Sequence, residues 1–218
     1  MENGAVRVAA CGGGRDTLLV LLLVLWVGVL VGWLGYLQYY AAKPGVGDHA
    51  DVRWPAGTTL CATPGRPALV VFLHPACPCS RASLDEFGRL AERLGDRADL
   101  RAVFVRPPGV PPGWEQTGLW SAAAALPRVT VVLDEDGLEA RRFGVATSGC
   151  TLLYDGRGRL VFSGGITPGR GHAGPSAGSE AIVRWFESAG APTAAAPVFG
   201  CPLLDRADET SETKGWRR

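Results

Sequence analysis

The 218-residue chain has little that would indicate nucleic-acid binding, phosphate binding or a repeat architecture. Its charge is balanced, with 22 Lys and Arg against 21 Asp and Glu, so no strongly basic or acidic surface is predicted. The 30 glycines match neither a P-loop nor a dinucleotide fingerprint. Only 3 histidines and 1 methionine are present, which disfavours metal sites built mainly from those residues. The 6 cysteines are therefore the main candidates for chemistry.

Charge is also absent from residues 17–37, and the next charged residue is Lys43. A helix over that run is about 30 Å long at about 1.5 Å per residue, enough to cross a bilayer. Aromatic residues typical of a membrane interface gather at its far end: Trp33, Tyr36, Tyr39 and Tyr40. A cleaved signal peptide would have a shorter apolar region and a small-residue cleavage site. We therefore predict an uncleaved transmembrane anchor over residues 17–40.

The flanks of this helix predict its orientation. Arg7 and Arg15 precede it, which favours a cytoplasmic tail over residues 1–16 and a translocated C-terminal domain. Gly28 and Gly32 form a small-xxx-small pair, which would allow two such helices to pack closely as a dimer.

The remainder divides into a linker (residues 41–64), a domain (65–190) and an extension (191–218) whose polar end, from residue 205, we expect to be disordered. Strands are predicted at 68–73, 100–105, 129–133, 151–154 and 160–163, and helices at 84–94, 115–126, 138–143 and 179–188. This alternation predicts an α/β domain with a mixed central sheet flanked by helices and a closing hairpin at one edge.

The chemistry is predicted where the first of these strands ends. Cys77 and Cys79 stand there one residue apart, where a helix should begin. Thiolate is the reactive and metal-binding form of cysteine, and a helix N-terminus lowers a cysteine pKa. Pro78 suits the first position of that helix. A possible capping box at residues 83–86 would instead begin the helix later, and Cys77 would then gain little from the helix dipole.

The element order, with a cysteine motif after the first core strand, resembles the thioredoxin fold over residues 65–190. The whole chain resembles the membrane-anchored, extracytoplasmic thioredoxin-like proteins of bacteria and is TlpA-like in outline. The segments HPACPCSRAS, SGCTLLYDGRGRLVFSGGIT and VFGCPL resemble those of proteins labelled RedB. The resemblance implies a thioredoxin-like fold on the periplasmic side and a redox activity.

The resemblance places Cys77 at the nucleophilic position and Ser80 where the resolving cysteine of Cys-x-x-Cys should be. Cys79 is an additional thiol one residue earlier. A disulfide between Cys77 and Cys79 would close a small strained ring, and strain makes a disulfide more oxidising.

The resemblance also places Cys150 near this pair, because residues 148–151 stand where thioredoxins have a cis-proline. Three thiolates suit Cu(I) or Zn(II). Cys150 is therefore a candidate resolving thiol, a candidate metal ligand or an inert strand residue. His74 either assists the thiolate, ligates a metal or merely ends the strand.

Cys61 and Cys201 are both expected at the opposite end of the domain, and we predict a structural disulfide between them. The alternative is that residues 191–200 run extended and carry Cys201 back to the site as a resolving thiol. Cys11 is expected on the other side of the membrane. The glycine-rich loop of residues 164–178 should hang near Cys77, where Arg170 and His172 either contact a thiolate or partner, or simply lie in a surface loop.

Three functional hypotheses follow. In the first, the chain is a thiol–disulfide oxidoreductase without a cofactor. Cys77 attacks a disulfide of an extracytoplasmic or membrane protein, or a peroxide, and Cys79, Cys150 or Cys201 resolves the intermediate. In the second, the chain is a non-enzymatic copper metallochaperone that uses Cys77, Cys79 and Cys150, with His74 as a further ligand. In the third, it is a docking module that binds a protein through the loop of residues 164–178.

Overall fold

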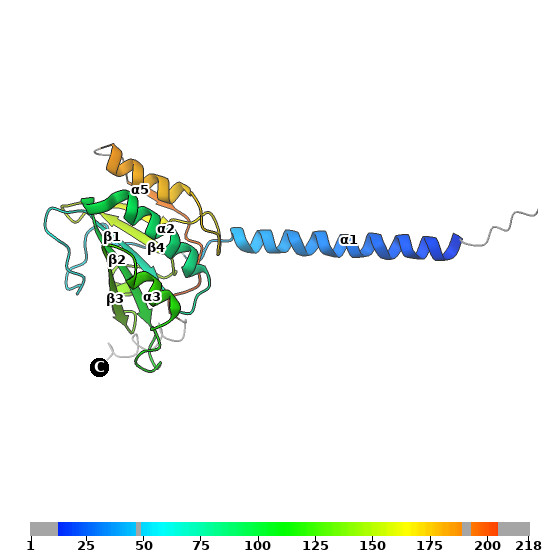
Figure 1. Ribbon diagram of the computed structural model, residues 1–218, viewed down its shortest axis with the longest axis horizontal. Helices are drawn as coiled ribbons and strands as arrows, with labels where there is room; N and C mark the ends of the chain where they lie inside the picture. The colour runs from blue at the N-terminus through cyan, green and yellow to red at the C-terminus, as the bar shows by residue number, and fades with distance from the viewer. Residues whose placement is uncertain (1–12, 47–48, 189–192, 205–218) are drawn as a thin grey trace, which may run out of the picture. The chain divides into compact units, whose positions relative to one another are not determined.

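The computed structural model describes residues 13–46, 49–188 and 193–204, in two compact units, residues 1–40 and 41–218. Helix α1 (Gly13–Ala42) fills most of the first unit (Figure 1). Its segment Asp16–Ala42 is apolar and long enough to cross a membrane, with a mean hydropathy of 2.7. The exposed large hydrophobic side chains of the described residues lie in α1, apart from Val46, Val52 and Leu138.

The second unit contains one mixed sheet in the order β3-β2-β1-β4-β5-β6. The strands are β1 (Ala68–Leu73), β2 (Asp99–Arg106), β3 (Val129–Glu135), β4 (Cys150–Tyr154), β5 (Leu160–Gly165) and β6 (Ala194–Ala196). Strands β1, β2 and β3 pair in parallel, whereas β4 is antiparallel to both β1 and β5. The central strand β1 is buried along its whole length, which explains its uninterrupted apolar sequence.

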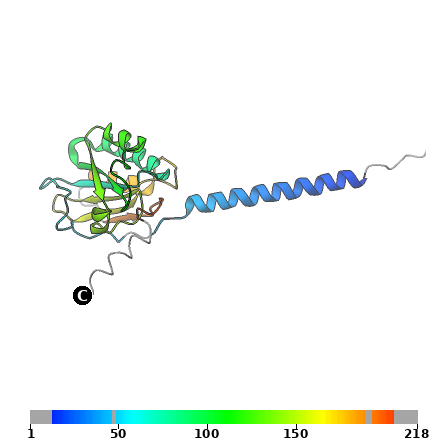
Figure 2. The ribbon, with the colours of Figure 1, turned by 90° about the horizontal axis from the view of Figure 1, so that it is seen from below.

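The helices are α2 (Cys79–Leu94), α3 (Gly118–Ala124), α4 (Leu138–Arg142) and α5 (Ala177–Glu187), with a short 3-10 helix at Gly95–Arg97. Apolar residues of α2, α3 and α5 pack on one face of β1, through Leu69, Val71 and Leu73. Figures 1 and 2 show these helices along one side of the sheet. Residues from α4 and the C-terminal segment pack on the other face, around Phe72.

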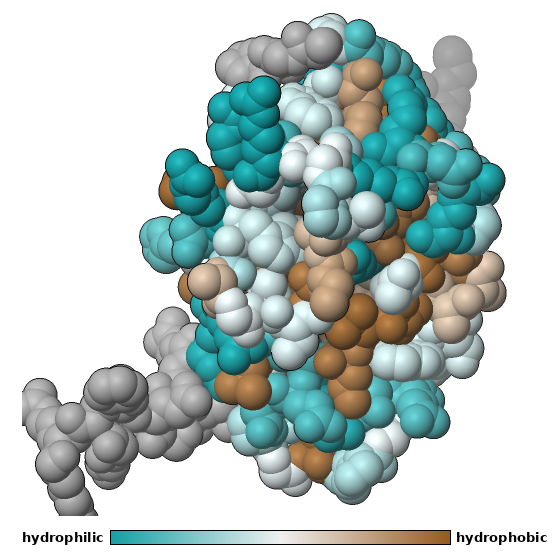
Figure 3. All heavy atoms as spheres, turned by 90° about the vertical axis from the view of Figure 1, so that its left-hand side faces the viewer, coloured by the Kyte–Doolittle hydropathy of each residue, from teal (hydrophilic) through white to brown (hydrophobic). Residues whose placement is uncertain are grey.

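Strand β6 is a feature that the sequence pattern did not predict. It pairs in parallel with β5 and extends the sheet beyond residue 190, where the predicted domain ended. The sheet is mixed and flanked by helices, as predicted. Figure 3 shows one face of the molecule, on which hydrophilic and hydrophobic residues are interspersed. Cys11, most of the predicted tail and the predicted disorder from residue 205 onward lie outside the described residues.

Candidate redox site

Cys77 lies in a turn between β1 and α2. Its backbone N–H donates to the carbonyl of His74 at 3.1 Å, and its own carbonyl accepts from Ser80 N–H at 3.1 Å. Helix α2 begins at Cys79 with Pro78 as its N-cap residue. The later start suggested by residues 83–86 is wrong, because α2 runs through them without a break. The thiol of Cys77 therefore lies immediately before the positive end of α2.

Ser80, at the position of the missing resolving cysteine, forms part of a buried hydrogen-bond network. Its hydroxyl donates to the carbonyl of His74 at 3.0 Å and lies 2.7 Å from the Ser148 hydroxyl. The Ser148 hydroxyl in turn accepts from His74 N–H at 2.9 Å. Both serines are 1% exposed, so this network joins the end of β1, the start of α2 and the turn before β4.

Three sulfur atoms meet at the N-terminus of α2. The Sγ atoms of Cys77, Cys79 and Cys201 all lie within 4.8 Å of one another. The predicted disulfide between Cys61 and Cys201 is therefore wrong: Cys61 is an exposed free thiol, and the chain after α5 returns Cys201 to the site. The described part of the alternative return, residues 193–200, does lead Cys201 to the site, and its role as a resolving thiol stays a prediction.

Cys150 does not belong to this group of sulfurs. It is fully buried on the face of the sheet that carries Phe72 and Phe143. Residues Leu152 and Tyr154 of β4 share that face, because side chains two positions apart in a strand point the same way. The prediction that Cys150 supplies the third sulfur is wrong, and Cys201 takes that place.

Cys201 is held by main-chain pairing to the turn that precedes β4. We call residues 198–203 the strap. Ser148 N–H donates to the carbonyl of Cys201 at 2.9 Å, and Leu203 N–H donates to the carbonyl of Ala146 at 2.8 Å. An antiparallel bridge between Thr147 and Pro202 lies between these bonds. The described residues contain no cis peptide bond, so this turn holds the strap without a cis-proline.

Arg170, from the glycine-rich loop, lies against the strap. Its Nη1 donates to the carbonyl of Gly200 at 2.6 Å, and its Nε donates to the carbonyl of Lys43 at 3.1 Å. Its positive charge lowers the pKa of both Cys79 and Cys201, opposing larger effects. Arg170 is thus a contact of the site, whereas His172 is exposed and its Nδ1 lies 2.7 Å from the carbonyl of Arg170.

His74 is placed beside the site and outside the sulfur group. Its Nδ1 accepts from the N–H of Ala76 at 3.3 Å, and its ring packs edge-on against Trp114 with centroids 5.4 Å apart. The orientation of the imidazole ring is thus set by a hydrogen bond within its own turn and by its contact with Trp114. Among the described residues, the group of possible metal-ligand atoms contains the three cysteine sulfurs and no nitrogen of His74. This group therefore does not support the metal-ligand role predicted for His74.

The three thiols differ in pKa because of their mutual arrangement. Burial raises the pKa of Cys77, but hydrogen bonds from Cys201, from Ser80 and from the Cys79 backbone outweigh it and lower the pKa below its ordinary value. Burial and the charge of Cys77 raise the pKa of Cys79. Burial and the hydrogen bond to Cys77 raise the pKa of Cys201 to about 12. The arrangement favours one thiolate, Cys77, surrounded by donors.

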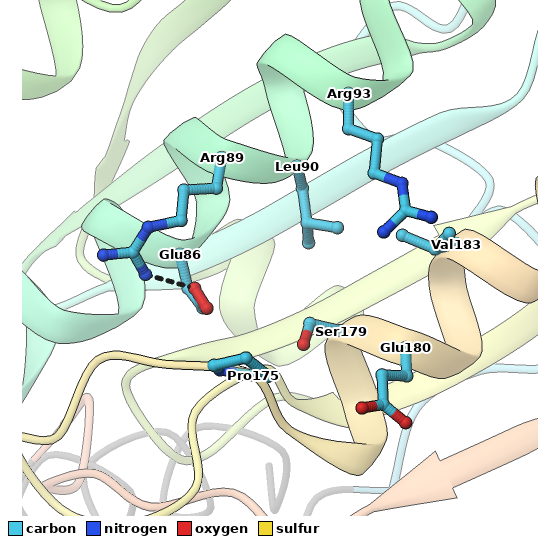
Figure 4. A pocket seen from close by; sticks show the side chains of 8 residues that line it. All are labelled: Glu86, Arg89, Leu90, Arg93, Pro175, Ser179, Glu180 and Val183. Carbon is cyan, nitrogen blue, oxygen red and sulfur yellow. Dashed lines mark hydrogen bonds and ion pairs between the residues drawn. The ribbon is translucent and has the colours of Figure 1, made fainter.

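Two of the hollows on the described part of the domain border helix α2. One, of about 410 Å³, opens beside the Cys77 thiol and is lined by Pro75, Ala76, Cys77, Pro78, Arg81, Thr117, Gly118 and Leu119. The other lies between α2 and α5, and Figure 4 shows the Glu86–Arg89 ion pair in it. This second hollow contains no thiol among its lining residues, so the first is the one relevant to sulfur chemistry.

Two solved structures that align with most of the chain support the fold. No protein-family model and no curated protein matches the chain. An uncharacterised conserved protein from Geobacillus kaustophilus aligns with a TM-score of 0.56 and 17% identity over 76% of this chain and 92% of that one. A hypothetical protein from Sinorhizobium meliloti aligns with a TM-score of 0.55 and 19% identity over 74% and 93%. A secreted disulfide oxidoreductase from Mycobacterium tuberculosis aligns with a TM-score of 0.36 and 21% identity over 44% and 67%.

The fold is thioredoxin-like, as the sequence resemblance implied. Strand β1 leads to the cysteine turn and α2, β2 lies beside it in parallel, and the β4–β5 hairpin and α5 complete the unit. In this fold Cys77 lies just before α2 and two further thiols lie within 4.8 Å of it, so the three cysteines together form a candidate site for thiol chemistry.

Proposed function

We propose that the chain is a membrane-anchored thiol–disulfide oxidoreductase in which Cys77 is the attacking thiolate. The observation that carries this proposal is the meeting of Cys77, Cys79 and Cys201 within 4.8 Å. Of the three, Cys77 has the lowered pKa, so it is the thiolate that attacks a disulfide of a client protein.

The exchange proceeds in two steps. The Cys77 thiolate attacks one sulfur of the client disulfide, which forms a mixed disulfide and releases the other client sulfur as a thiolate that takes up a proton. A second cysteine of this chain loses its proton and attacks Cys77 Sγ, which releases the client's second thiolate. Two electrons pass to the client, and this chain ends with an internal disulfide. The same steps in reverse oxidise a client dithiol.

Both Cys79 and Cys201 are close enough to resolve the mixed disulfide. Cys79 would close a small ring with Cys77, which strains the bond, whereas Cys201 approaches from a distant segment and closes no small ring. Cys201 also hydrogen-bonds Cys77 through its side chain. We therefore assign the resolving role to Cys201.

We propose that α1 is the membrane anchor and that the domain lies on the extracytoplasmic side, where disulfides form and persist. The length and apolar surface of α1 support an anchor, and the two arginines before it support the orientation. Extraction of membranes at alkaline pH should leave the full-length chain in the membrane pellet. A mature chain that begins after α1 would contradict an uncleaved anchor.

A second candidate function is Cu(I) binding, favoured by the same three sulfurs. Three thiolates about 2.3 Å from one ion lie about 4.0 Å apart, and the limit of 4.8 Å is close to that spacing. The donor set thus fits a soft metal, with Cys201 in place of the predicted Cys150. A bound ion would hold all three as thiolates, including the two thiols whose pKa is raised.

Turnover of a model disulfide separates the two functions. The full-length chain in detergent should accelerate the reduction of a disulfide-bonded peptide by a small dithiol, and Cys77→Ser should abolish that acceleration. Cys61→Ser is the matched control, because Cys61 is an exposed thiol outside the sulfur group. Equal rates with and without Cys77 would refute the oxidoreductase, and stoichiometric Cu(I) binding without turnover would establish the metal-binding function.

A further inference from the structure

The strap makes contacts of a kind that a separate polypeptide could make. Its two bonds to residues 146–148 join main-chain atoms: Ser148 N–H to the carbonyl of Cys201, and Leu203 N–H to the carbonyl of Ala146. Main-chain pairing of this kind accepts any extended segment, and side-chain pockets then select the sequence. Residues 146–148 are therefore an edge to which the strap adds in antiparallel orientation.

The strap also covers the reactive sulfur. Cys77 is 6% exposed, and Cys201 lies against it. On either side of Cys201, Val198 and Leu203 are buried in the same apolar cluster, at 7% and 1% exposure. Arg170 holds the carbonyl of Gly200 between them.

We propose that the strap occupies the docking place of a client's extended, cysteine-bearing segment, and that a client reaches Cys77 from this edge only when the strap leaves. The inference rests on the proposed thiol–disulfide exchange and names the client class for it. A client cysteine placed where Cys201 lies would have its sulfur within reach of Cys77.

The contacts of the strap define which client segments fit. A Cβ atom at Gly200 would stand 1.8 Å from the carbonyl oxygen of Ser148, a backbone atom that side-chain rotation cannot remove. The residue before the client cysteine must therefore be glycine. The position two residues after the cysteine corresponds to Leu203, which is buried, so an apolar residue fits there.

Oxidation closes the strap covalently. When the thiols of Cys77 and Cys201 become a disulfide, their two electrons reduce the client disulfide to a dithiol, which takes up two protons. The strap is then bonded to the site. An external dithiol restores both thiols and is itself oxidised to a disulfide, after which only the non-covalent contacts hold the strap.

The first test loosens the strap without altering a thiol. Gly200→Ala forces a methyl group against Ser148, whereas Gly14→Ala adds the same methyl where no atom lies within 4 Å. The reduced full-length chain is alkylated over a range of pH, with modification of Cys77 followed by peptide mass spectrometry. The plateau rate at high pH is compared, because all Cys77 is thiolate there and a changed pKa has no effect.

We expect the plateau rate to rise about tenfold in Gly200→Ala, equivalent to about 1.4 kcal/mol, and to stay unchanged in Gly14→Ala. An equal plateau in the folded Gly200→Ala chain would overturn the proposal. Retention of the far-ultraviolet circular dichroism spectrum identifies the folded chain.

The second test supplies the strap in trans and does not depend on the variant folding normally. A fluorescent peptide Val-Phe-Gly-Ser-Pro-Leu-Leu is titrated onto the reduced wild-type chain, beside a peptide with alanine in place of glycine. We expect the glycine peptide to bind at least about tenfold more tightly than the alanine peptide. Equal affinities, or no binding of either peptide, would overturn the proposal. Neither test involves electron transfer, so a failure of disulfide turnover leaves both readouts intact.

Discussion

Replacement of Cys201 by alanine should raise the pKa of Cys77. In the native site the thiol of Cys201 donates a hydrogen bond to the Cys77 sulfur, and this bond is the largest of the effects that lower the Cys77 pKa. Alanine removes the donor and leaves the backbone of the strap in place. The remaining hydrogen bonds, from Ser80 and from backbone groups, continue to lower the pKa.

The magnitude follows from the strength of one such bond. A hydrogen bond to a charged group contributes about 1.5–3 kcal/mol, and a thiol is a weak donor, which favours the lower end of that range. One pKa unit corresponds to about 1.36 kcal/mol. We therefore expect the pKa of Cys77 to rise by about one unit in Cys201→Ala. The Cys201→Ser variant retains an O–H donor and should show a smaller rise.

The assay is the pH midpoint of Cys77 alkylation in the reduced chain, resolved from the other thiols by peptide mass spectrometry. The midpoint is independent of access to the sulfur, which changes the plateau and not the titration. Cys61→Ala is the control, since its thiol lies outside the sulfur group, and should leave the midpoint unchanged. A midpoint in Cys201→Ala equal to or lower than that of the native chain would refute this account of the Cys77 thiolate.

Further substitutions test the contacts around the site. Ser80→Ala removes a buried hydroxyl bonded to Ser148 and should lower the free energy of unfolding by about 1–3 kcal/mol in urea titrations; an unchanged value would contradict the network. Arg170→Gln removes the charged donor to the carbonyl of Gly200 and should speed hydrogen exchange of the strap amides about tenfold; unchanged exchange would show that Arg170 does not hold the strap. Leu203→Ala leaves a cavity beside a buried cluster and should cost about 2–5 kcal/mol of unfolding free energy; a loss below about 1 kcal/mol would mean that Leu203 is not anchored there.

The sheet and the cysteine turn were predictable because they depend on local pattern. The apolar run of β1 has the predicted bounds, Ala68–Leu73, and α2 follows the cysteine turn. A strand buried on both faces and an amphipathic helix each have a characteristic pattern of apolar residues along the sequence. These elements can therefore be predicted without knowing which distant segments they contact.

The identity of the third cysteine depended on a contact between distant segments of the chain. The sequence therefore left Cys201 as one of two alternatives, beside Cys150. The strap is held by main-chain bonds to residues 146–148, which leave little trace in side-chain pattern. Strand β6 is three alanines long, too short to show an alternation. For Cys150, the signal was present: Leu152 and Tyr154 are apolar at alternate positions, which predicts a buried face for Cys150 as well. Gly200 before Cys201 was a further signal, since it permits the close approach to Ser148.

The central claim is that Cys77 exchanges disulfides with Cys201 as its resolving partner. It is tested most directly by mapping the disulfides of the full-length chain by mass spectrometry after equilibration in thiol–disulfide buffers of increasing oxidising strength. We expect a reversible Cys77–Cys201 disulfide to form, with Cys61 unpaired. A Cys77 that stays a thiol at every potential, or a Cys61–Cys201 disulfide, would contradict the account.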